Sequence, residues 1–393
     1  MDTRWAIVLL TVGAGVIAAG HVGKAPPALP QIRAELDLGL VAGGWVISVF
    51  SATGVVMGLA AGSLADRVGH RLFLLIGLAL MMAGSLAGSF AASGTLLLAT
   101  RVIEGLGYIV IAVSAPSLIA AASASRDRRF ALGIWGAYMP LGSSAMMLIS
   151  PLILGTLGWR GLWQVMAALT LVWVLVMLIG TRAPPAPAHD APPPTSWARN
   201  VRLTLSRPGP WLLAASFALY TVAFTSLFSW LPTFLVEQRG LGIGAAATLT
   251  AFVVAINAPG NLLAGWLLRH GWSHWSLLAL SGAIMGVTLL GIFATTLPDG
   301  LRYALCLGFS GFGGMLPTAA LAAAPTFAPS PAQVGTMNGV LVQGANTGMF
   351  FGPPAIAAVV AATGQWESVV WVMVAASAAI VVLAFAVRRI EQA

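Results

Sequence analysis

Two pairs of ionisable residues stand inside long apolar stretches of the sequence, where charged side chains are costly. His21 and Lys24 lie in the first stretch, and Arg101 and Glu104 lie in the fourth. Each pair is spaced i, i+3, so in a helix its members share one face. A carboxylate or an imidazole can carry a proton, and a buried cation can bind an anion. The pairs are therefore candidates for proton coupling and for anion binding.

Each of these residues also has an interpretation without function. Lys24, the only lysine of the chain, could extend to the outer membrane–water boundary. Arg101 and Glu104 could form a structural ion pair, and His21 could be a packed core histidine. In a helix, Lys24 stands about 28 Å beyond Trp5. Arg101 lies a few residues into a helix that enters from the same side, so the two pairs are predicted to lie at similar depth.

The elements that position these residues are predicted to be membrane helices. The 393 residues are 59% hydrophobic and 8% charged, against about 45–50% and about 25% in soluble domains. The net charge of +8 does not indicate nucleic-acid binding, because the basic residues stand singly or in small clusters between apolar runs. A single cysteine, Cys306, excludes internal disulfides and cysteine-rich metal sites.

The apolar stretches predict an all-α membrane protein with twelve transmembrane helices, arranged as two pseudo-symmetric six-helix bundles. A spanning helix needs about 20 apolar residues. Twelve such segments begin near Trp5, Leu40, Leu72, Leu96, Arg129, Gly161, Pro210, Gly244, Trp275, Leu301, Pro331 and Trp366. The predicted domains are an N-terminal bundle over 1–181, an extended proline-rich linker over 182–208 and a C-terminal bundle over 209–393.

The two halves share an internal repeat. Gly107 and Pro116 match Gly308 and Pro317 at an offset of 201, and Gly142 and Pro151 match Gly344 and Pro353 at 202. A nearly constant offset indicates duplication. Transporters built from parallel six-helix repeats bind substrate between the repeats near the bilayer midplane.

The arginines predict the orientation. At the far ends of the predicted helices only Arg33, Arg160, Arg239 and Arg302 occur, whereas thirteen arginines lie on the side of the N-terminus. Basic residues concentrate on the cytoplasmic side of membrane proteins. The linker and both termini are therefore expected in the cytoplasm, with the chain spanning a bacterial inner membrane.

Two motifs resemble those of the major facilitator superfamily. Residues 62–71 are similar to its loop between helices 2 and 3, Gly-x-Leu-Ala-Asp-Arg-x-Gly-Arg-Arg/Lys, with His70 in place of arginine. Residues 101–107 resemble Arg-x-x-Gln-Gly-x-Gly of helix 4, with Glu104 in place of glutamine. The resemblance covers essentially the whole chain, and Gly352-Pro353-Pro354 looks similar to the cyanate and nitroimidazole porters. It implies the major facilitator fold and transport by alternating access.

The resemblance also implies a conformational gate in the first motif. Its members would be Gly62, Asp66, Arg67, Gly69 and Arg71. The carboxylate of Asp66 would meet the N-terminus of helix 11, for which the sequence offers Ser330 as N-cap and Pro331 as first helical residue. The helix dipole favours a carboxylate at that position.

Further substrate-binding candidates are aromatic and polar residues inside the spans. With His21, Lys24 and Arg101 they are Tyr108, Tyr138, Tyr220, Phe224, Asn257, Gln343 and Asn346. Aromatic stripes more often pack than bind, and the amides serve equally well as helix–helix hydrogen bonds. The proton-coupling candidates are Glu104 and His21. At the C-half positions matching His21 and Lys24 stand Ala223 and Ser226, which carry no charge.

These observations predict a secondary active transporter, not an enzyme, with no cofactor or metal, because no phosphate loop or zinc-type spacing occurs. With His21 neutral, Lys24, Arg101 and Glu104 sum to +1, which favours a small organic anion or carboxylate-bearing solute with proton coupling. The alternatives are a proton-coupled multidrug antiporter, whose helix 5 signature is degraded here, and a transporter-like sensor that transports nothing. The expected partners are a small-molecule substrate, protons and the lipid bilayer, without nucleic acid, and the protein is expected to be a monomer.

Overall fold

The computed structural model describes residues 2–59, 64–65, 68–181, 197–330 and 333–392, and the regular secondary structure in these ranges is helical. Eleven helical stretches of this part are long and apolar enough to cross a membrane. One of them, Phe130–Gly180, holds two spans, because Gly158 interrupts it with a φ of 65°. The described part therefore contains the twelve predicted spans.

The N-terminal six spans are built from consecutive helical segments. They are α1 (Trp5–Gly23) and α2 (Ala25–Glu35); α3 (Leu40–Ser48), η1 (Val49–Ser51) and α4 (Ala52–Met57); α6 (His70–Gly88); α7 (Gly94–Ala122); and α8 (Arg128–Gly136) with α9 (Tyr138–Gly180), whose two parts form spans five and six.

The C-terminal six spans follow the same order. They are α11 (Pro208–Arg239); α12 (Ile243–Ala255) and α13 (Asn257–Arg269); α14 (His274–Ile292); α15 (Asp299–Gly313) and α16 (Met315–Ala322); α18 (Val334–Thr363); and η3 (Trp366–Val369) with α19 (Val370–Glu391). The short helices α10 (Trp197–Leu205) and α17 (Ala324–Phe327) lie outside the spans.

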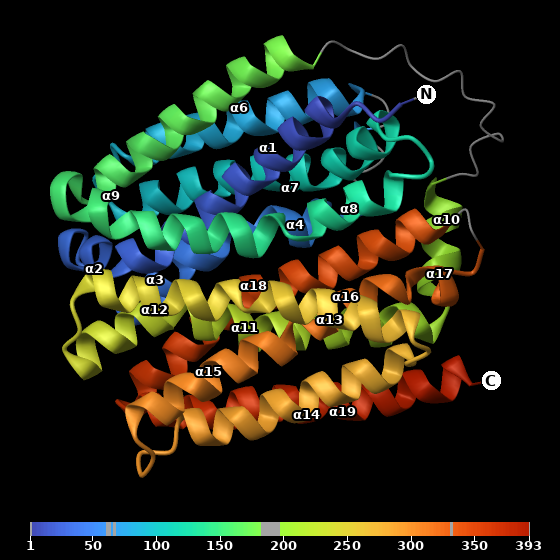
Figure 1. Cartoon of the computed structure of the whole chain (residues 1–393). Helices are drawn as coiled ribbons and strands as arrows, with labels where there is room; N and C mark the ends of the chain where they lie inside the picture. Colours follow the sequence, from blue (N-terminus) through green and yellow to red (C-terminus); the bar gives the residue numbers. More distant parts are fainter. Residues whose placement is uncertain (1, 60–63, 66–67, 182–196, 331–332, 393) are drawn as a thin grey trace.

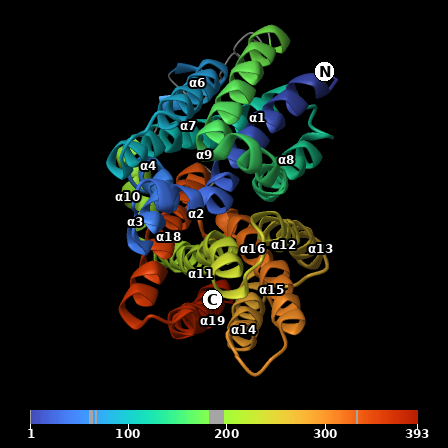
Figure 2. The ribbon, with the colours of Figure 1, turned by 90° about the vertical axis from the view of Figure 1, so that its left-hand side faces the viewer.

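The spans lie roughly antiparallel, and both chain termini are at the same end of the bundle (Figure 1). The end away from the termini is called the far end below. Viewed from that end, the spans of the N-terminal half and those of the C-terminal half form two groups, one above the other (Figure 2). An even number of spans places both termini on one side of a membrane.

The predicted linker is only partly described. Residues 182–196 lie outside the described residues. The expectation of an extended segment was wrong for the residues that follow, because Trp197–Leu205 form α10. Gln333 donates from Nε2 to Oδ1 of Asn200 at 3.2 Å, so α10 lies beside the start of α18.

Two interruptions shape the first and second spans. In the first, Pro26 and Pro27 follow Lys24. Since proline has no backbone N–H, α1 ends and α2 begins at this point. In the second, the 3-10 turn η1 separates α3 from α4. Short 3-10 segments inside a helix often accompany functional sites.

Small residues let the spans approach closely around these interruptions. A Cβ built on Gly105 would overlap the carbonyl oxygen of Phe50, and one on Gly142 would overlap that of Val16. Helix–helix packing in membranes commonly uses small residues in this way. The fourth span is thereby held against the second, and the fifth against the first.

The two halves meet closely at the far end. A Cβ on Gly44 would lie 2.9 Å from Cα of Pro354, and the rings of Trp45 and Phe350 are 5.0 Å apart. An ion pair also joins the halves there, with Nη1 of Arg33 lying 2.8 Å from Oε1 of Glu237. This end of the interface is closed by backbone packing, aromatic contact and charge.

A buried charge cluster as the candidate functional site

Lys24 and Glu104 form the centre of the site. Nζ of Lys24 lies 2.8 Å from Oε1 of Glu104, and both side chains are fully buried. Nζ also donates to Oγ of Ser85 at 2.7 Å and lies 4.2 Å from the ring centroid of Trp163. The alternative in which Lys24 extends to the membrane boundary is therefore wrong, because its ammonium group points into the protein.

Arg101 completes the cluster from the neighbouring turn of α7. Its Nη1 pairs with Oε2 of Glu104 and donates to the carbonyl of His21 at 3.1 Å. Its Nε donates to the carbonyl of Val46 at 3.2 Å, and its guanidinium carbon lies 4.6 Å from the ring centroid of Phe50. The two pairs thus lie at one depth, as their positions along the predicted helices indicated.

One carboxylate serves two buried cations in this cluster. Glu104 uses one oxygen for Lys24 and the other for Arg101. An isolated charge in a low-dielectric interior is expensive, so each cation requires a counter-charge or several hydrogen bonds. With a neutral histidine, the cluster carries a net charge of +1.

The partners of His21 assign its neutral form. Nζ of Lys24 lies 3.2 Å from Nδ1, and an ammonium group can only donate, so Nδ1 is the acceptor. Nε2 lies 2.9 Å from Oγ1 of Thr170. That hydroxyl donates its own proton to the carbonyl of Met166 at 2.7 Å. Nε2 therefore carries the hydrogen, and the ring is an uncharged link between α9 and the cluster.

Aromatic residues of the N-terminal half continue the contacts of the cluster. The ring of Phe50, which lies against Arg101, is 5.2 Å from the ring of Tyr108. The hydroxyls of Tyr108 and Tyr138 are 2.9 Å apart, and Tyr138 stacks on Trp135 at 4.1 Å. A continuous set of contacts therefore joins the charges to these two predicted tyrosines.

In the C-terminal half, Tyr220 and Asn257 contact each other. Nδ2 of Asn257 donates to the Tyr220 hydroxyl at 3.0 Å and to the carbonyl of Ser310 at 2.9 Å. Phe224 stacks on Tyr220 at 5.4 Å and packs against Phe228 at 5.5 Å. The amide thus links three helices, and the aromatic stripe of α11 predicted from the sequence is continuous.

Gln343 and Asn346 lie on α18 against the second span. Nε2 of Gln343 donates across the interface to the carbonyl of Val55 at 2.5 Å. Nδ2 of Asn346 donates to the carbonyl of Val342 at 2.8 Å. A Cβ on Gly54 would overlap the side-chain amide of Asn346. In this structure both amides take part in the contact between the halves.

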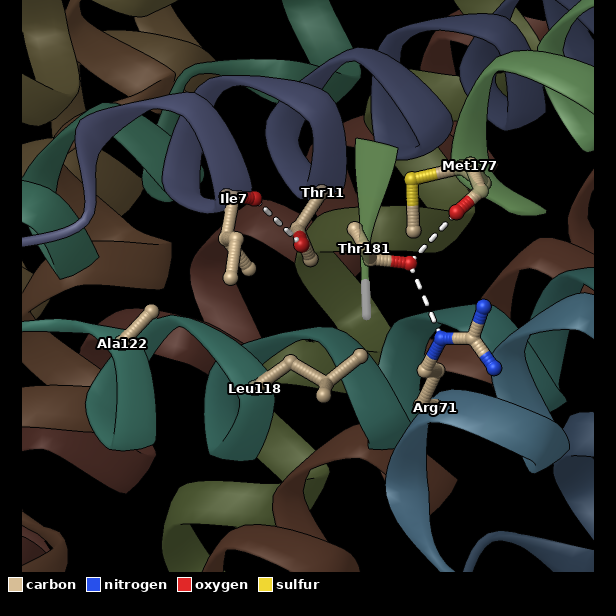
Figure 3. Close-up of a pocket in the computed structure, with 7 residues that line it drawn as sticks. All are labelled: Ile7, Thr11, Arg71, Leu118, Ala122, Met177 and Thr181. Carbon is tan, nitrogen blue, oxygen red and sulfur yellow. Dashed lines mark hydrogen bonds between the residues drawn. The ribbon is translucent and has the colours of Figure 1, made fainter. Parts of the chain in front are cut away.

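The predicted gate is described only in part, since Gly62, Asp66 and Arg67 lie outside the described residues. Gly69 has a φ of 89°, which suits glycine. Arg71 donates from Nε to Oγ1 of Thr181 at 3.0 Å and from Nη2 to the carbonyl of Leu178 at 3.2 Å. Figure 3 shows the first of these bonds beside a small pocket between α1, α6, α7 and α9. Arg71 thus ties the third span to the sixth within one half.

The predicted cap of helix 11 falls partly outside the described residues, because Pro331 lies there. Gln333 forms part of a 3-10 turn directly before α18. Its backbone N–H donates to the carbonyl of Ser330 at 3.0 Å, and the Ser330 hydroxyl bonds to its Oε1. Ser330 as the N-cap and Pro331 as the first helical residue therefore stay a prediction.

The sequence interpretation missed three members of the site, Ser85, Trp163 and Thr170. They come from the third and sixth spans, which carry no intramembrane charge. Their signal was weak: Gly84 and Gly88 flank Ser85, and a Cβ on Gly84 would lie 2.9 Å from Cγ of Glu104. Two glycines around a lone hydroxyl mark a close approach of helices.

Residues 11–330 match the sequence profile of the Major Facilitator Superfamily. The chain belongs to this superfamily. It is accordingly a multi-pass membrane protein of a transporter family. In fold, this member of the superfamily is similar to the crystal structure of a bacterial homologue of the human lysosomal transporter spinster, with a TM-score of 0.80 at 17% identity over 99% of this chain and 97% of that chain.

The relatives of this superfamily member have different names. The probable sulfoacetate transporter SauU of Cupriavidus necator is 24% identical over 86% of this chain and 83% of its own length. The multidrug resistance protein Stp of Mycobacterium tuberculosis is 32% identical over 38% of this chain, a match spanning 28% of Stp. Human spinster homolog 1 is 29% identical over 54% of this chain, a match spanning 42% of that protein. The chain thus spans less than half the length of the last two relatives.

Proposed function

We propose that the chain is a proton-coupled secondary transporter that moves a small organic anion across the membrane by alternating access. The observation that supports this most directly is the cluster in which Lys24 and Arg101 share one carboxylate, Glu104, with every side chain buried. Such a group has an excess positive charge that an anion can neutralise, and it holds a carboxylate that can take up a proton.

The anion preference follows from charge. Removing a cation from water requires compensation, and Glu104 supplies one negative charge for two cations. When the halves rearrange, an anionic cargo that reaches Lys24 or Arg101 would supply the second. An organic cation would add to the excess charge. SauU and the hexuronate transporter of Bacillus subtilis, 23% identical over 62% of this chain and 59% of its own length, are named for anions.

Proton coupling is proposed to run through Glu104, with His21 as the second carrier. Protonation of Glu104 would leave its two cations without a counter-charge. Proton uptake by Glu104 would therefore favour binding of an anion. The neutral imidazole of His21 lies between Lys24 and Thr170. Its Nδ1 lies 3.7 Å from Oε2 of Glu104, close enough to exchange a proton after a small rearrangement.

Alternating access is proposed to be a rocking of residues 1–181 against residues 209–393. The far end is closed here by the contact of Gly44 with Pro354 and by the ion pair of Arg33 with Glu237. The opposite end would be closed in the alternate state by the loop that contains Gly62, Asp66, Arg67, Gly69 and Arg71. We place that end in the cytoplasm of a bacterial cell, because most arginines lie there, and we expect a monomer.

Substitution of Lys24 tests the proposal. Affinity for sulfoacetate and glucuronate is measured by thermal shift on purified wild type, Lys24→Ala and Lys24→Arg, and uptake is measured in proteoliposomes. Charge-assisted contacts contribute roughly 1.5–3 kcal/mol, so Lys24→Ala should weaken anion binding about tenfold or more. Lys24→Arg should bind the anion only slightly better than Lys24→Ala does, because the guanidinium fork presents its donors differently from an ammonium group. Arg269→Ala, at an exposed position, is the control.

A multidrug antiporter is the second candidate, and it is supported by the similarity to Stp and by the aromatic set around Tyr108, Tyr138 and Trp135. Apolar and cationic drugs would bind such a surface. Binding of organic cations with no effect of either Lys24 substitution would favour this candidate and exclude the anion proposal. A chain that binds solutes but transports none in proteoliposomes would be a sensor.

A further inference from the structure

A cavity of about 390 Å³ lies inside the C-terminal half, away from the charge cluster. Residues of α11, α12, α14, α15, α18 and α19 line it. It follows one face of α11 from Ser226 to Arg239. Thirteen helical positions span about 20 Å, so the cavity runs from the middle of the membrane to its far surface.

The cavity extends along α11. Its volume is about 390 Å³, and the α11 residues that line it span about 20 Å. One extended hydrocarbon chain suits this volume and this length.

The walls of the cavity are apolar and aromatic. Trp230 and Phe234 of α11 lie 5.8 and 5.9 Å from the ring of Trp366. Leu249 of α12 and Ile356 of α18 contribute to the opposite walls. Each methylene moved from water into such surroundings gains about 0.8 kcal/mol, so a hydrocarbon chain would bind in proportion to its length.

The mouth of the cavity is cationic. Oδ1 of Asp299 lies 3.2 Å from Nη2 of Arg239 and 3.3 Å from Nη1 of Arg302. The charged residues that line the cavity are these three, so one carboxylate again serves two cations and the net charge is +1. The Arg302 side chain is only 7% exposed, and its Nε donates to the carbonyl of Ile292 at 2.7 Å. A buried, oriented guanidinium at the end of an apolar channel is suited to an anionic headgroup.

We propose that this cavity binds a single-chain amphiphile with an anionic headgroup, such as a fatty acid. The chain would extend along α11 toward Ser226, and the headgroup would lie at the membrane surface beside Arg239 and Arg302, whose two positive charges Asp299 balances only in part. The site is separate from the proposed transport site, since none of the cluster residues lines it. Amphiphile binding in this cavity can therefore be tested independently of the anion transport proposed above.

Brominated dodecanoate provides the test, because bromine on the chain quenches tryptophan fluorescence at contact distance and Trp230 and Trp366 line the cavity. The full chain is placed in nanodiscs of a zwitterionic diacyl lipid and titrated. We expect saturable quenching that the double variant Trp230→Phe/Trp366→Phe loses, whereas Trp159→Phe, in the N-terminal half, retains it.

Two further variants separate binding from folding. Arg239→Gln should weaken dodecanoate about threefold to tenfold, and Arg269→Gln should leave it unchanged. Ile356→Phe fills the channel and should abolish saturable quenching without lowering the unfolding temperature. Dodecyltrimethylammonium should not compete. Three results would overturn the proposal. They are quenching that never saturates, quenching that persists in folded Ile356→Phe protein, and relief of quenching by dodecyltrimethylammonium as effective as relief by unlabelled dodecanoate.

Discussion

Nζ of Lys24 lies 2.8 Å from Oε1 of Glu104, although 80 residues separate them in the chain and neither is accessible to solvent. The other carboxylate oxygen pairs with Arg101. Glu104 therefore balances two cations from two helices and joins the first span to the fourth. The consequences of removing one charge depend strongly on which charge is removed.

Removing Glu104 should destabilise the protein much more than removing Lys24. Glu104→Gln leaves two buried cations without a counter-charge, and breaking a buried pair in this way costs about 3–5 kcal/mol. Lys24→Met leaves Arg101 and Glu104 as a balanced pair. The double variant Lys24→Met/Glu104→Gln should recover part of the loss. Unfolding temperatures of the three purified variants measure this, and equal losses for both single variants would show that the charges are not coupled.

Gly105→Ala should prevent stable packing of the fourth span against the second. The added methyl group would overlap the Phe50 carbonyl oxygen, which is backbone and cannot rotate away. Gly133→Ala is the matched control, because nothing lies within 4 Å of its Cβ position and helical glycine to alanine is otherwise favourable by up to about 1 kcal/mol. Size-exclusion profiles and unfolding temperatures should show loss for the first variant only. A well-folded Gly105→Ala protein would contradict the close approach.

The ion pair of Arg33 with Glu237 should bias the far end toward closure. Arg33→Glu places two carboxylates together, and the exchange variant Arg33→Glu/Glu237→Arg should restore closure. Partly exposed pairs contribute about 0.2–1 kcal/mol, so Arg33→Glu should change the ratio of closed to open far ends by up to about fivefold. Electron paramagnetic resonance distances between labels at Ala34 and Gln238 report this. Arg160→Glu is the control, since Arg160 pairs with Glu35 within one half. An equal change in the label distances for Arg160→Glu would show that the Arg33–Glu237 pair does not control closure.

The orientation can be checked by labelling in intact cells. Ser125 and Gln238 are exposed and lie at opposite ends of the spans. In a Cys306→Ala background, a membrane-impermeant maleimide should label Gln238→Cys and spare Ser125→Cys until the cells are opened. The reverse pattern would place both termini outside and would contradict the arginine distribution.

The spans and the two charged pairs could be predicted because the bilayer allows few solutions. A long apolar run must be a helix with its backbone groups bonded internally, and a charge within it must find a partner. The number of spans and the similar depth of the two charged pairs were predicted from these constraints, whereas the pairing of Lys24 with Glu104 came from the structure. The sixth span was predicted to begin near Gly161, close to the turn that the structure has at Gly158.

The remaining site residues, helix α10 and the cavity along α11 could not be predicted, because they depend on tertiary contacts that leave little trace in one sequence. Ser85 and Thr170 are ordinary hydroxyl residues of apolar helices until the fold brings them to Lys24 and His21. Helix α10 follows a proline-rich segment, and that composition dominated the prediction of an extended linker. The cavity along α11 is formed by six helices, so no local pattern could indicate it.

Proton coupling through Glu104 can be tested without the instability of its single substitution. Lys24→Met keeps the carboxylate, and Lys24→Met/Glu104→Gln removes it while lowering the buried charge imbalance, so the two form a matched pair. Both are reconstituted and given saturating sulfoacetate. If Glu104 carries the proton, the single variant should still accumulate substrate in response to a pH gradient. The double variant should exchange substrate across the membrane without accumulating it, because an amide cannot take up a proton in this range. Accumulation by the double variant equal to that of the single variant would show that the proton travels elsewhere. His21, between Lys24 and Thr170, would then be the next residue to substitute.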